Sequence, residues 1–431
     1  MQFSTNVIST ILALCLFLVP LHLVAAPEDE YIVISKKGAD NIALALDNLD
    51  IQSGDDGKVA HSLDLIIRDG LAFPGLFTIL APPVNVHESS GINFKAPGLS
   101  NAEVYVRGVV IKNAGNVSLD MKVYSIGAAK LLFSKTYVGK ETQLRSIGYA
   151  FCADIVENLT GRRSAYGSKI VFISNKTGFK EIYQCDFDGQ GIEQLTNSRS
   201  ISLTPALSPD GKYLAYTDYS TGRPALYIRN QLDGKTVMAG NSGISIDPAW
   251  RNSRELATTL SFEGDQEIYL LKSDGTLYRR LTRSNGIDLS PTFSPDGNKM
   301  AYVSERNGQP QIFIQDLLSG EARRLTFNGD YNTQPSWSPS GDKIAYTTCE
   351  KSGEFNIFTV GVDGSGLKQL TDQAGQNESP SWSPDGEMVV FTSNRDGKRR
   401  LYTMGSTGKN QRVLLQMAGE QMQPFWSLFR K

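Results

Sequence analysis

Histidine is the scarcest reactive residue in this chain, with only three among 431 residues. His22 lies in an apolar leading segment, and His61 and His87 both precede the repeated half of the sequence described below. Enzymes that use a serine or cysteine nucleophile most often need a histidine as the base, and no Gly-x-Ser-x-Gly motif occurs here. We therefore predict no catalytic residues.

Cysteine is also sparse and irregularly spaced. Beyond the leading segment the chain has Cys152, Cys185 and Cys349, an odd number with no regular interval. Such a set fits neither a disulfide framework nor a zinc site, so we expect buried, small apolar side chains. The sequence also has no phosphate-binding loop and no cluster of His and Cys, and it therefore predicts no cofactor and no metal.

Neither sign of charge dominates, since 43 Lys and Arg stand against 45 Asp and Glu. A net charge of −2 argues against a general nucleic-acid binder, which usually carries a basic surface. With 20% charged and 40% hydrophobic residues, the chain is predicted to be globular, neither disordered nor a multi-span membrane protein.

The first 26 residues read as a secretory signal. A mostly apolar run, Val7–Val19, is followed by Pro20 and by the small residues Val24-Ala25-Ala26. The run is shorter than the ~20 residues that a membrane span needs. We therefore predict removal of residues 1–26 and no membrane span in the mature chain.

One pattern returns six times in the second half of the chain. Its fullest copies are Ser290–Gly297 and Ser379–Gly386, each reading Ser-Pro-x-aromatic-Ser-Pro-Asp-Gly before a short apolar strand. The lead prolines recur every 43 to 45 residues, at Pro205, Pro248, Pro291, Pro335, Pro380 and Pro424. Ser-Pro-Asp-Gly is a typical type I turn, and each repeat reads as four short strands. Four strands in about 44 residues are typical of a β-propeller blade.

The two ends of the repeat region complement each other. Gly167–Phe172 matches the second strand of a repeat and lacks the strand before it, whereas Gln423–Ser427 is a first strand alone. Together they make one blade that closes the ring and leaves no open edge. We therefore predict an all-β, six-bladed β-propeller over residues 167–431.

The segment before the ring follows another pattern. Helical periodicity over residues 59–69 and 141–159 alternates with strands at 31–34, 77–80, 103–111, 117–126 and 131–138. Residues 27–160 are thus predicted to form an α/β N-terminal domain, joined to the propeller by a linker at residues 161–166.

Two recurrent residue types in the repeats have competing interpretations. Asp210, Asp296 and Asp385 could form a ring of metal ligands, but each occupies a turn that its carboxylate helps to stabilise. The recurrent tryptophans could stack on ligands, but one shared inner-strand position favours core packing for Trp250, Trp337, Trp382 and Trp426.

The loops at the channel mouth are the remaining candidate site. In a propeller, the loops that join the fourth strand of one blade to the first of the next share a face with the loops between second and third strands. These loops combine an apolar centre with a polar edge, as protein-binding surfaces do. We predict a binding mouth that includes Ile244, Asp247, Leu289, Ser290, Tyr331, Asn332 and Glu378.

The whole arrangement resembles the TolB family of the bacterial Tol-Pal envelope system. Besides the six repeats, the matching features are Tyr31-Ile32-Val33-Ile34 after the signal, Gly108-Val109-Val110, and Ile155–Gly161 before the ring. The resemblance implies a non-enzymatic adaptor in the periplasm whose propeller mouth binds the peptidoglycan-associated lipoprotein Pal.

The resemblance further implies that the N-terminal segment, with Tyr31, Ile32, Val33 and Ile34, contacts the inner-membrane protein TolA, and that other outer-membrane proteins are further partners. It also implies support of outer-membrane integrity and of envelope constriction during cell division. Two alternatives from other classes remain: a periplasmic hydrolase or lyase that uses the propeller channel, and a propeller that senses a small ligand.

Overall fold

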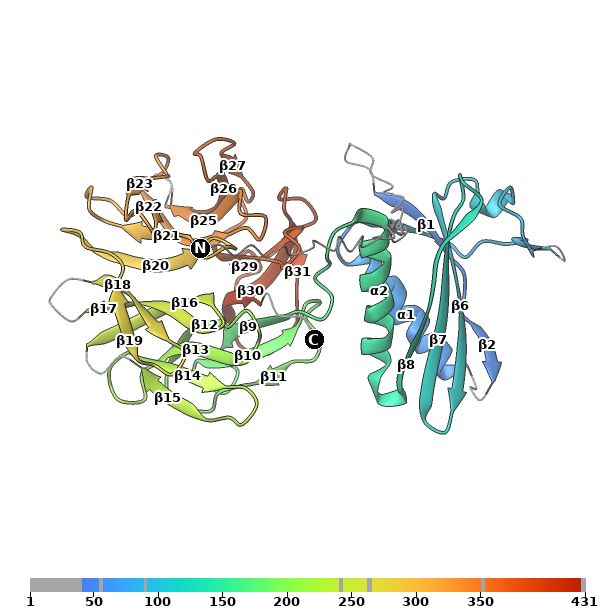
Figure 1. The fold of residues 1–431 in the computed structure, drawn as a ribbon, viewed down its shortest axis with the longest axis horizontal. Coiled ribbons are helices and arrows are strands. Elements are labelled where there is room, and N and C mark those ends of the chain that lie inside the picture. The colour runs from blue at the N-terminus through green and yellow to red at the C-terminus, as the bar shows by residue number, and fades with distance from the viewer. Residues whose placement is uncertain are drawn as a thin grey trace, which may run out of the picture.

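The computed structural model describes residues 41–53, 57–88, 91–239, 243–261, 266–349 and 353–427. The predicted signal and the predicted strand Tyr31–Ile34 lie outside these residues. The described chain forms two lobes, an α/β part drawn in blue to green and a propeller drawn from green to red (Figure 1). This pair of folds confirms the predicted fold class.

The α/β part is one mixed sheet with two helices. Its strands run in the order β3-β1-β6-β7-β8, with β2 beside β6. The helices are α1 (Lys58–Ala72) and α2 (Leu144–Thr160), and a 3₁₀ turn (Glu141–Gln143) precedes α2. The sheet strands are β1 (Ile42–Leu46), β2 (Asp50–Ser53), β3 (Phe77–Leu80), β6 (Val104–Asn113), β7 (Asn116–Ser125) and β8 (Lys130–Lys140).

The alternation of side chains decides which sheet face meets the helices. Along β7, Val117, Leu119, Met121 and Val123 are fully buried in one core with the helices, while the residues between them are partly exposed. The other face is partly covered by residues 82–102, which hold the short strands β4 (His87–Glu88) and β5 (Gly91–Ile92) and the 3₁₀ turn Pro97–Leu99.

Six four-stranded sheets form the propeller. We number the blades along the chain and give the number six to the blade that joins both ends. Blades 1 to 3 are β12 (Ser202–Leu207), β13 (Tyr213–Asp218), β14 (Ala225–Asn230), β15 (Thr236–Ala239); β16 (Ile244–Asn252), β17 (Glu255–Ser261), β18 (Glu267–Lys272), β19 (Leu277–Arg280); and β20 (Asp288–Phe293), β21 (Lys299–Ser304), β22 (Gln311–Asp316), β23 (Ala322–Arg324). Blades 4 to 6 are β24 (Tyr331–Trp337), β25 (Lys343–Cys349), β26 (Phe355–Gly361), β27 (Lys368–Gln369); β28 (Asn377–Trp382), β29 (Met388–Ser393), β30 (Arg400–Gly405), β31 (Arg412–Val413); and β32 (Gln421–Trp426), β9 (Lys169–Ser174), β10 (Glu181–Asp186), β11 (Glu193–Gln194).

Blade 6 closes the ring as the sequence predicts. Strand β32 pairs antiparallel with β9, and Lys169 N donates to the hydroxyl of Ser427 across 258 residues of chain. The indole Nε1 of Trp426 donates to the hydroxyl of Ser168 at 2.8 Å, and the ring is buried. All four tryptophans are buried on inner strands, which supports their interpretation as core residues.

Two hydrogen-bond arrangements recur in several of the blades. In the Ser-Pro-Asp-Gly turns the serine hydroxyl donates to the aspartate, as from Ser208 to Asp210 at 2.7 Å, which gives the recurrent aspartates a structural role. In the Leu-Thr pair that ends several blades, the threonine hydroxyl accepts from the third strand. Thr326 Oγ1, for example, accepts from Ile312 N at 2.9 Å and donates to Gln311 Oε1 at 2.8 Å.

An aromatic side chain joins the two lobes. Phe187, in the turn between β10 and β11, packs its ring against Phe73, Tyr149 and Tyr166 of the N-terminal side, with centroids 5.4, 5.1 and 4.9 Å away. Next to it, Asp188 accepts from the guanidinium of Arg145 at 2.9 Å and from the hydroxyl of Tyr149 at 2.5 Å. One hydrophobic core therefore runs continuously from the helices into blade 6.

Candidate functional site

The mouth of the propeller lies on the face that the α/β part leaves free. The α/β part and linker contact turns between first and second strands or between third and fourth strands, as in the ion pair of Arg162 with Glu387 and the bonds to Asp188. The loops of the mouth connect the other strand pairs and therefore lie at the opposite face. A partner can thus approach the mouth without displacing the described residues of the α/β part.

A ring of six residues in an unusual conformation lines the channel below the mouth. The residue before each lead proline has a positive φ of 47 to 56°, a value that few residues other than glycine adopt. Each inner strand shifts its register at this point, which leaves the proline, without an N–H, outside the ladder. The ring consists of Thr204, Asp247, Ser290, Gln334, Ser379 and Gln423.

The ring residues bond in pairs across neighbouring blades. Ser290 Oγ donates to Asp247 Oδ2 at 2.7 Å, between blades 3 and 2. The amide oxygen of Gln334 accepts from Ser379 N at 2.9 Å, and that of Gln423 accepts from Thr204 N at 3.1 Å. These contacts join the blades two by two at the channel and fix the ring side chains.

The ring and its prolines enclose a hollow of about 340 Å³ that opens at the mouth. Leu289, Tyr331, Thr333 and Phe425 complete its wall. Burial raises the pKa of the Asp247 carboxyl, and the hydrogen bond from Ser290 opposes that shift. Asp247 is the single acidic residue among those that line this hollow.

The predicted mouth residues occupy three different positions. Ile244 and Tyr331 present 40% and 43% of their surface to solvent at the rim, and Leu289 is half-buried. Asp247 and Ser290 belong to the channel ring. Asn332 is fully buried, and its amide donates to Gln311 Oε1 at 2.8 Å, so it supports the loop from inside.

Glu378, the last of the predicted mouth residues, is half-buried near the rim of blade 5. Its carboxylate lies 3.8 Å from the guanidinium of Arg399. This separation makes a weak ion pair between two partly exposed groups, which a partner can rearrange at little cost.

Four ring residues and several rim residues were not among the seven predicted binding residues, although the four ring residues each end a loop that the sequence places at the mouth. Thr204, Gln334, Ser379 and Gln423 share one signal, their place before a lead proline. At the rim, Phe327 is 71% exposed and lies under the guanidinium of Arg324 at 4.8 Å. Phe179 and Ile201 are also exposed there, so apolar side chains surround the mouth at several blades.

The described residues place no catalytic set at the mouth. His61 is exposed on α1 and His87 lies in β4, both in the α/β part. No group of three or more His, Cys, Asp or Glu suited to a metal occurs within the described ranges. Burial raises the pKa of the thiols of Cys152 and Cys185, which keeps them protonated and unreactive.

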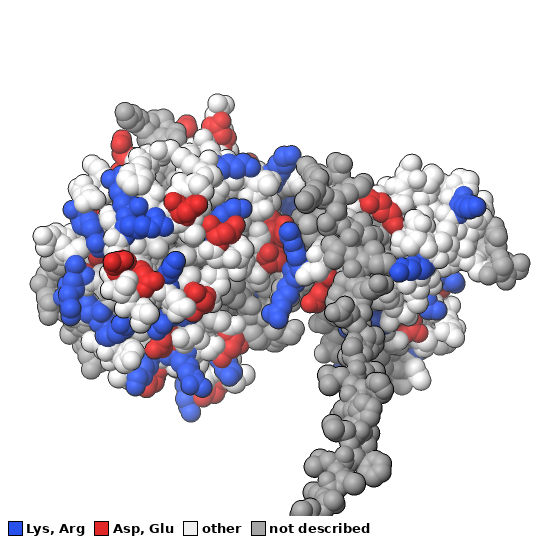
Figure 2. Space-filling model, turned by 45° about the horizontal axis from the view of Figure 1, so that its top comes forward, with Lys and Arg blue, Asp and Glu red and all other residues white. Residues whose placement is uncertain are grey.

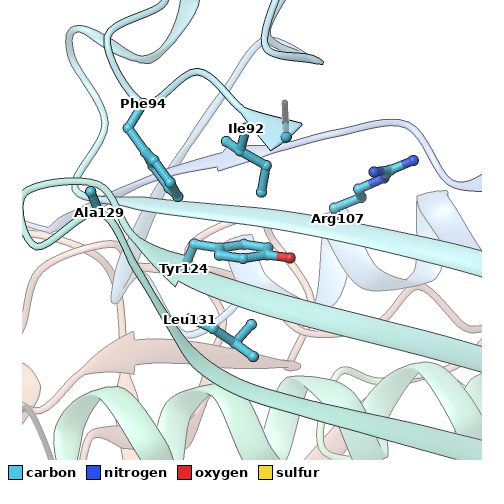
Figure 3. Close-up of a pocket in the computed structure, with 7 residues that line it drawn as sticks. Ile92, Phe94, Arg107, Tyr124, Ala129 and Leu131 are labelled. Atoms are coloured by element: carbon cyan, nitrogen blue, oxygen red, sulfur yellow. The ribbon is translucent and has the colours of Figure 1, made fainter. Parts of the chain in front are cut away.

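A second hollow, of about 500 Å³, lies in the α/β part (Figure 3). Phe94 and Ile92 face Tyr124 and Leu131 across it, with Arg107 at its edge. Arg107 is bound to Asp50 at 2.8 Å, and Tyr124 stacks on Tyr105. The guanidinium is thus already neutralised, and the hollow offers chiefly an apolar wall.

The propeller surface in view in Figure 2 carries mixed charge. Lys and Arg side chains are interspersed with Asp and Glu over the propeller face in view in Figure 2, as the net charge of −2 anticipates. Among the described helices, none has both the length and the apolar character that crossing a membrane requires.

Comparisons with known proteins agree with this architecture. The family described as TolB beta propeller domain matches residues 156–430. A protein named TolB homolog from Chlorobium luteolum is 57% identical over 354 residues, which cover 81% of each chain. The Tol-Pal system protein TolB of Desulfosudis oleivorans is 41% identical over 267 residues, 60% of this chain and 61% of that one.

A solved structure shows the same fold. The crystal structure of TolB from Acinetobacter baumannii superposes with a TM-score of 0.80 at 24% identity, covering 90% of this chain and 97% of that one. The fold of both parts and the high sequence identity to known relatives therefore agree on the family. The chain belongs to the TolB family, whose relatives are named as proteins of the Tol-Pal system.

Proposed function

We propose that this protein is a non-enzymatic adaptor of the Tol-Pal system in the periplasm, and that its propeller mouth binds Pal. The observation that carries the proposal is a closed propeller whose mouth lies opposite the docked α/β part and combines exposed apolar residues with a fixed polar ring. Apolar anchors inside a polar rim are the usual makeup of a protein interface.

The N-terminal segment has a separate role in this proposal. Tyr31, Ile32, Val33 and Ile34 bind TolA as an added strand, a mode in which main-chain hydrogen bonds supply affinity. The two contacts together connect the inner membrane to the outer envelope. Through them the protein supports outer-membrane integrity and constriction during cell division, and other outer-membrane proteins are further partners.

Replacing two rim anchors tests Pal binding. We expect the double variant Ile244→Ala, Tyr331→Ala to lower affinity for the soluble domain of Pal at least about tenfold, because interface energy concentrates in a few aromatic and apolar anchors. Leu318→Ala is the matched control, since Leu318 is almost fully exposed in a turn of the opposite face. Calorimetric titration of each purified variant supplies the affinities. Unchanged Pal affinity in the double variant would remove the mouth assignment.

Deleting residues 27–38 tests the TolA contact. We expect the deletion to abolish TolA binding and to change Pal affinity without abolishing it, because the segment is proposed to pack either on the protein or on TolA. Equal Pal affinity with and without the segment would show that the two sites are independent.

A further inference from the structure

The charged residues of the rim are sorted by blade. The loops at 175–180, 197–201 and 219–224, on blades 6 and 1, carry Lys176, Lys180, Arg199 and Arg223 and no acidic residue. The half-buried acidic residue beside them is Glu420 before β32, whose carboxylate accepts from Arg399 N at 3.4 Å. Lys176, Arg199 and Arg223 are exposed and Lys180 is half-buried. We call these four residues the basic sector.

Acidic residues occupy the described rim of blades 3 and 4. Glu305 follows β21, Asp330 precedes β24 and Asp372 follows β27. Arg306 lies among them, but its guanidinium is bound at 3.0 Å to the fully buried carboxylate of Asp288, so its charge is already balanced. We call Glu305, Asp330 and Asp372 the acidic sector.

The two sectors face each other across the channel. In a ring of six blades, blade 6 stands opposite blade 3 and blade 1 stands opposite blade 4. The loops beside the sectors are mixed: Asp396, Lys398 and Arg399 lie on blade 5, and the exposed Arg283 lies in the loop between blades 2 and 3. No ion pair or side-chain hydrogen bond within the described chain engages any of the seven sector side chains, so their charges are available to a partner.

We infer that the mouth is an electrostatic dipole that orients its protein partner. The partner presents an acidic edge to blades 6 and 1 and a basic edge to blades 3 and 4, with apolar side chains over the channel. Complementary potentials raise the rate of association and suppress wrong orientations more than they raise affinity. The inference rests on the proposed binding of Pal at the mouth and specifies how Pal is oriented there.

Three variants of the full mature chain separate orientation from net charge. The first, Lys176→Glu, Arg199→Glu, Arg223→Glu, reverses the basic sector. The second adds Glu305→Lys, Asp330→Lys and Asp372→Lys, which inverts the dipole and restores the net charge. The control, Lys235→Glu, Arg254→Glu, Lys272→Glu, makes the same charge change at exposed positions of the opposite face. Thermal unfolding of each variant verifies that it is folded.

The test is to measure the association and dissociation rates of each variant with the soluble domain of Pal from the same organism. At low salt we expect the first variant to associate about tenfold more slowly and the second more slowly still, with the control within about twofold of the original chain. The differences shrink at high salt, where the Debye length falls to about 3 Å at 1 M. If the second variant recovered the original association rate, or if the control slowed association equally, the dipole would be refuted. Net charge would then be sufficient to explain the association rates. Absence of Pal binding by the unaltered chain would instead refute the proposed function.

Discussion

Replacing Phe187 by alanine is expected to uncouple the two lobes. The ring is 1% exposed and touches three aromatic rings of the N-terminal side, so it links the helices to blade 6 through one continuous core. Truncating a buried phenylalanine typically costs 3–5 kcal/mol, from lost burial and from the cavity that remains. Because this cost falls on the junction, we expect the α/β part to unfold before the propeller.

The assay is denaturation followed by two probes and by calorimetry. The unaltered chain is expected to show one cooperative transition, and Phe187→Ala is expected to show two, with the first shifted by about 3–5 kcal/mol in unfolding free energy. Phe179→Ala is the matched control, since the same side chain type is exposed there and should change stability by less than about 0.5 kcal/mol. If Phe187→Ala behaves like Phe179→Ala, the continuous core does not couple the lobes.

Two further predictions concern the propeller. Asp247→Asn should raise stability at neutral pH, because the pKa of this carboxyl is raised in the folded chain. At pH values above the ordinary aspartate pKa of about 3.9, the folded chain holds a proton at Asp247 that the unfolded chain has lost. The stability of the original chain therefore falls as pH rises from about 3.9 through the raised pKa of Asp247. Urea titrations at several pH values should show that the stability gained by Asp247→Asn disappears below about pH 3.9. Thr326→Val should cost about 1–3 kcal/mol, because the N–H of Ile312 loses its buried acceptor. The exposed Thr221→Val is its control, and equal urea midpoints for the two would refute the role of the Leu-Thr pair.

The propeller was predictable because its signals are local. A Ser-Pro-Asp-Gly turn specifies its own geometry, and a period of 43 to 45 residues identifies the blades without knowledge of any long-range contact. Strands β1 and β2 were missed, since IALAL and DIQS are short and the first has no polar alternation. The predicted helix 141–159 begins as a 3₁₀ turn, and α2 itself starts at Leu144.

The site was predictable as a set of loops and less so as individual side chains. Tyr331 and Asn332 are neighbours at the start of β24, and strand alternation exposes the first side chain and buries the second. Asp247 and Ser290 were predicted at the mouth, but the ring as a whole was not recognised, because its six members have four different side chains and share only a backbone angle. Phe187 lies in an ordinary Asp-x-Asp-Gly turn, and its insertion between the lobes depends on tertiary contacts that no local pattern encodes.

The pairing of β32 with β9 has a consequence for the order of events in the cell. The contact between Lys169 and Ser427 spans 258 residues, and the blade that it completes also carries Phe187. Contacts this distant in sequence form late, since the chain between them must be ordered first. A closed ring cannot form while β32 is still being synthesised, because that strand supplies the inner edge of blade 6. The hollow at the proposed mouth is likewise complete only once β32 has paired with β9, because Gln423, Pro424 and Phe425 of that strand form part of its wall.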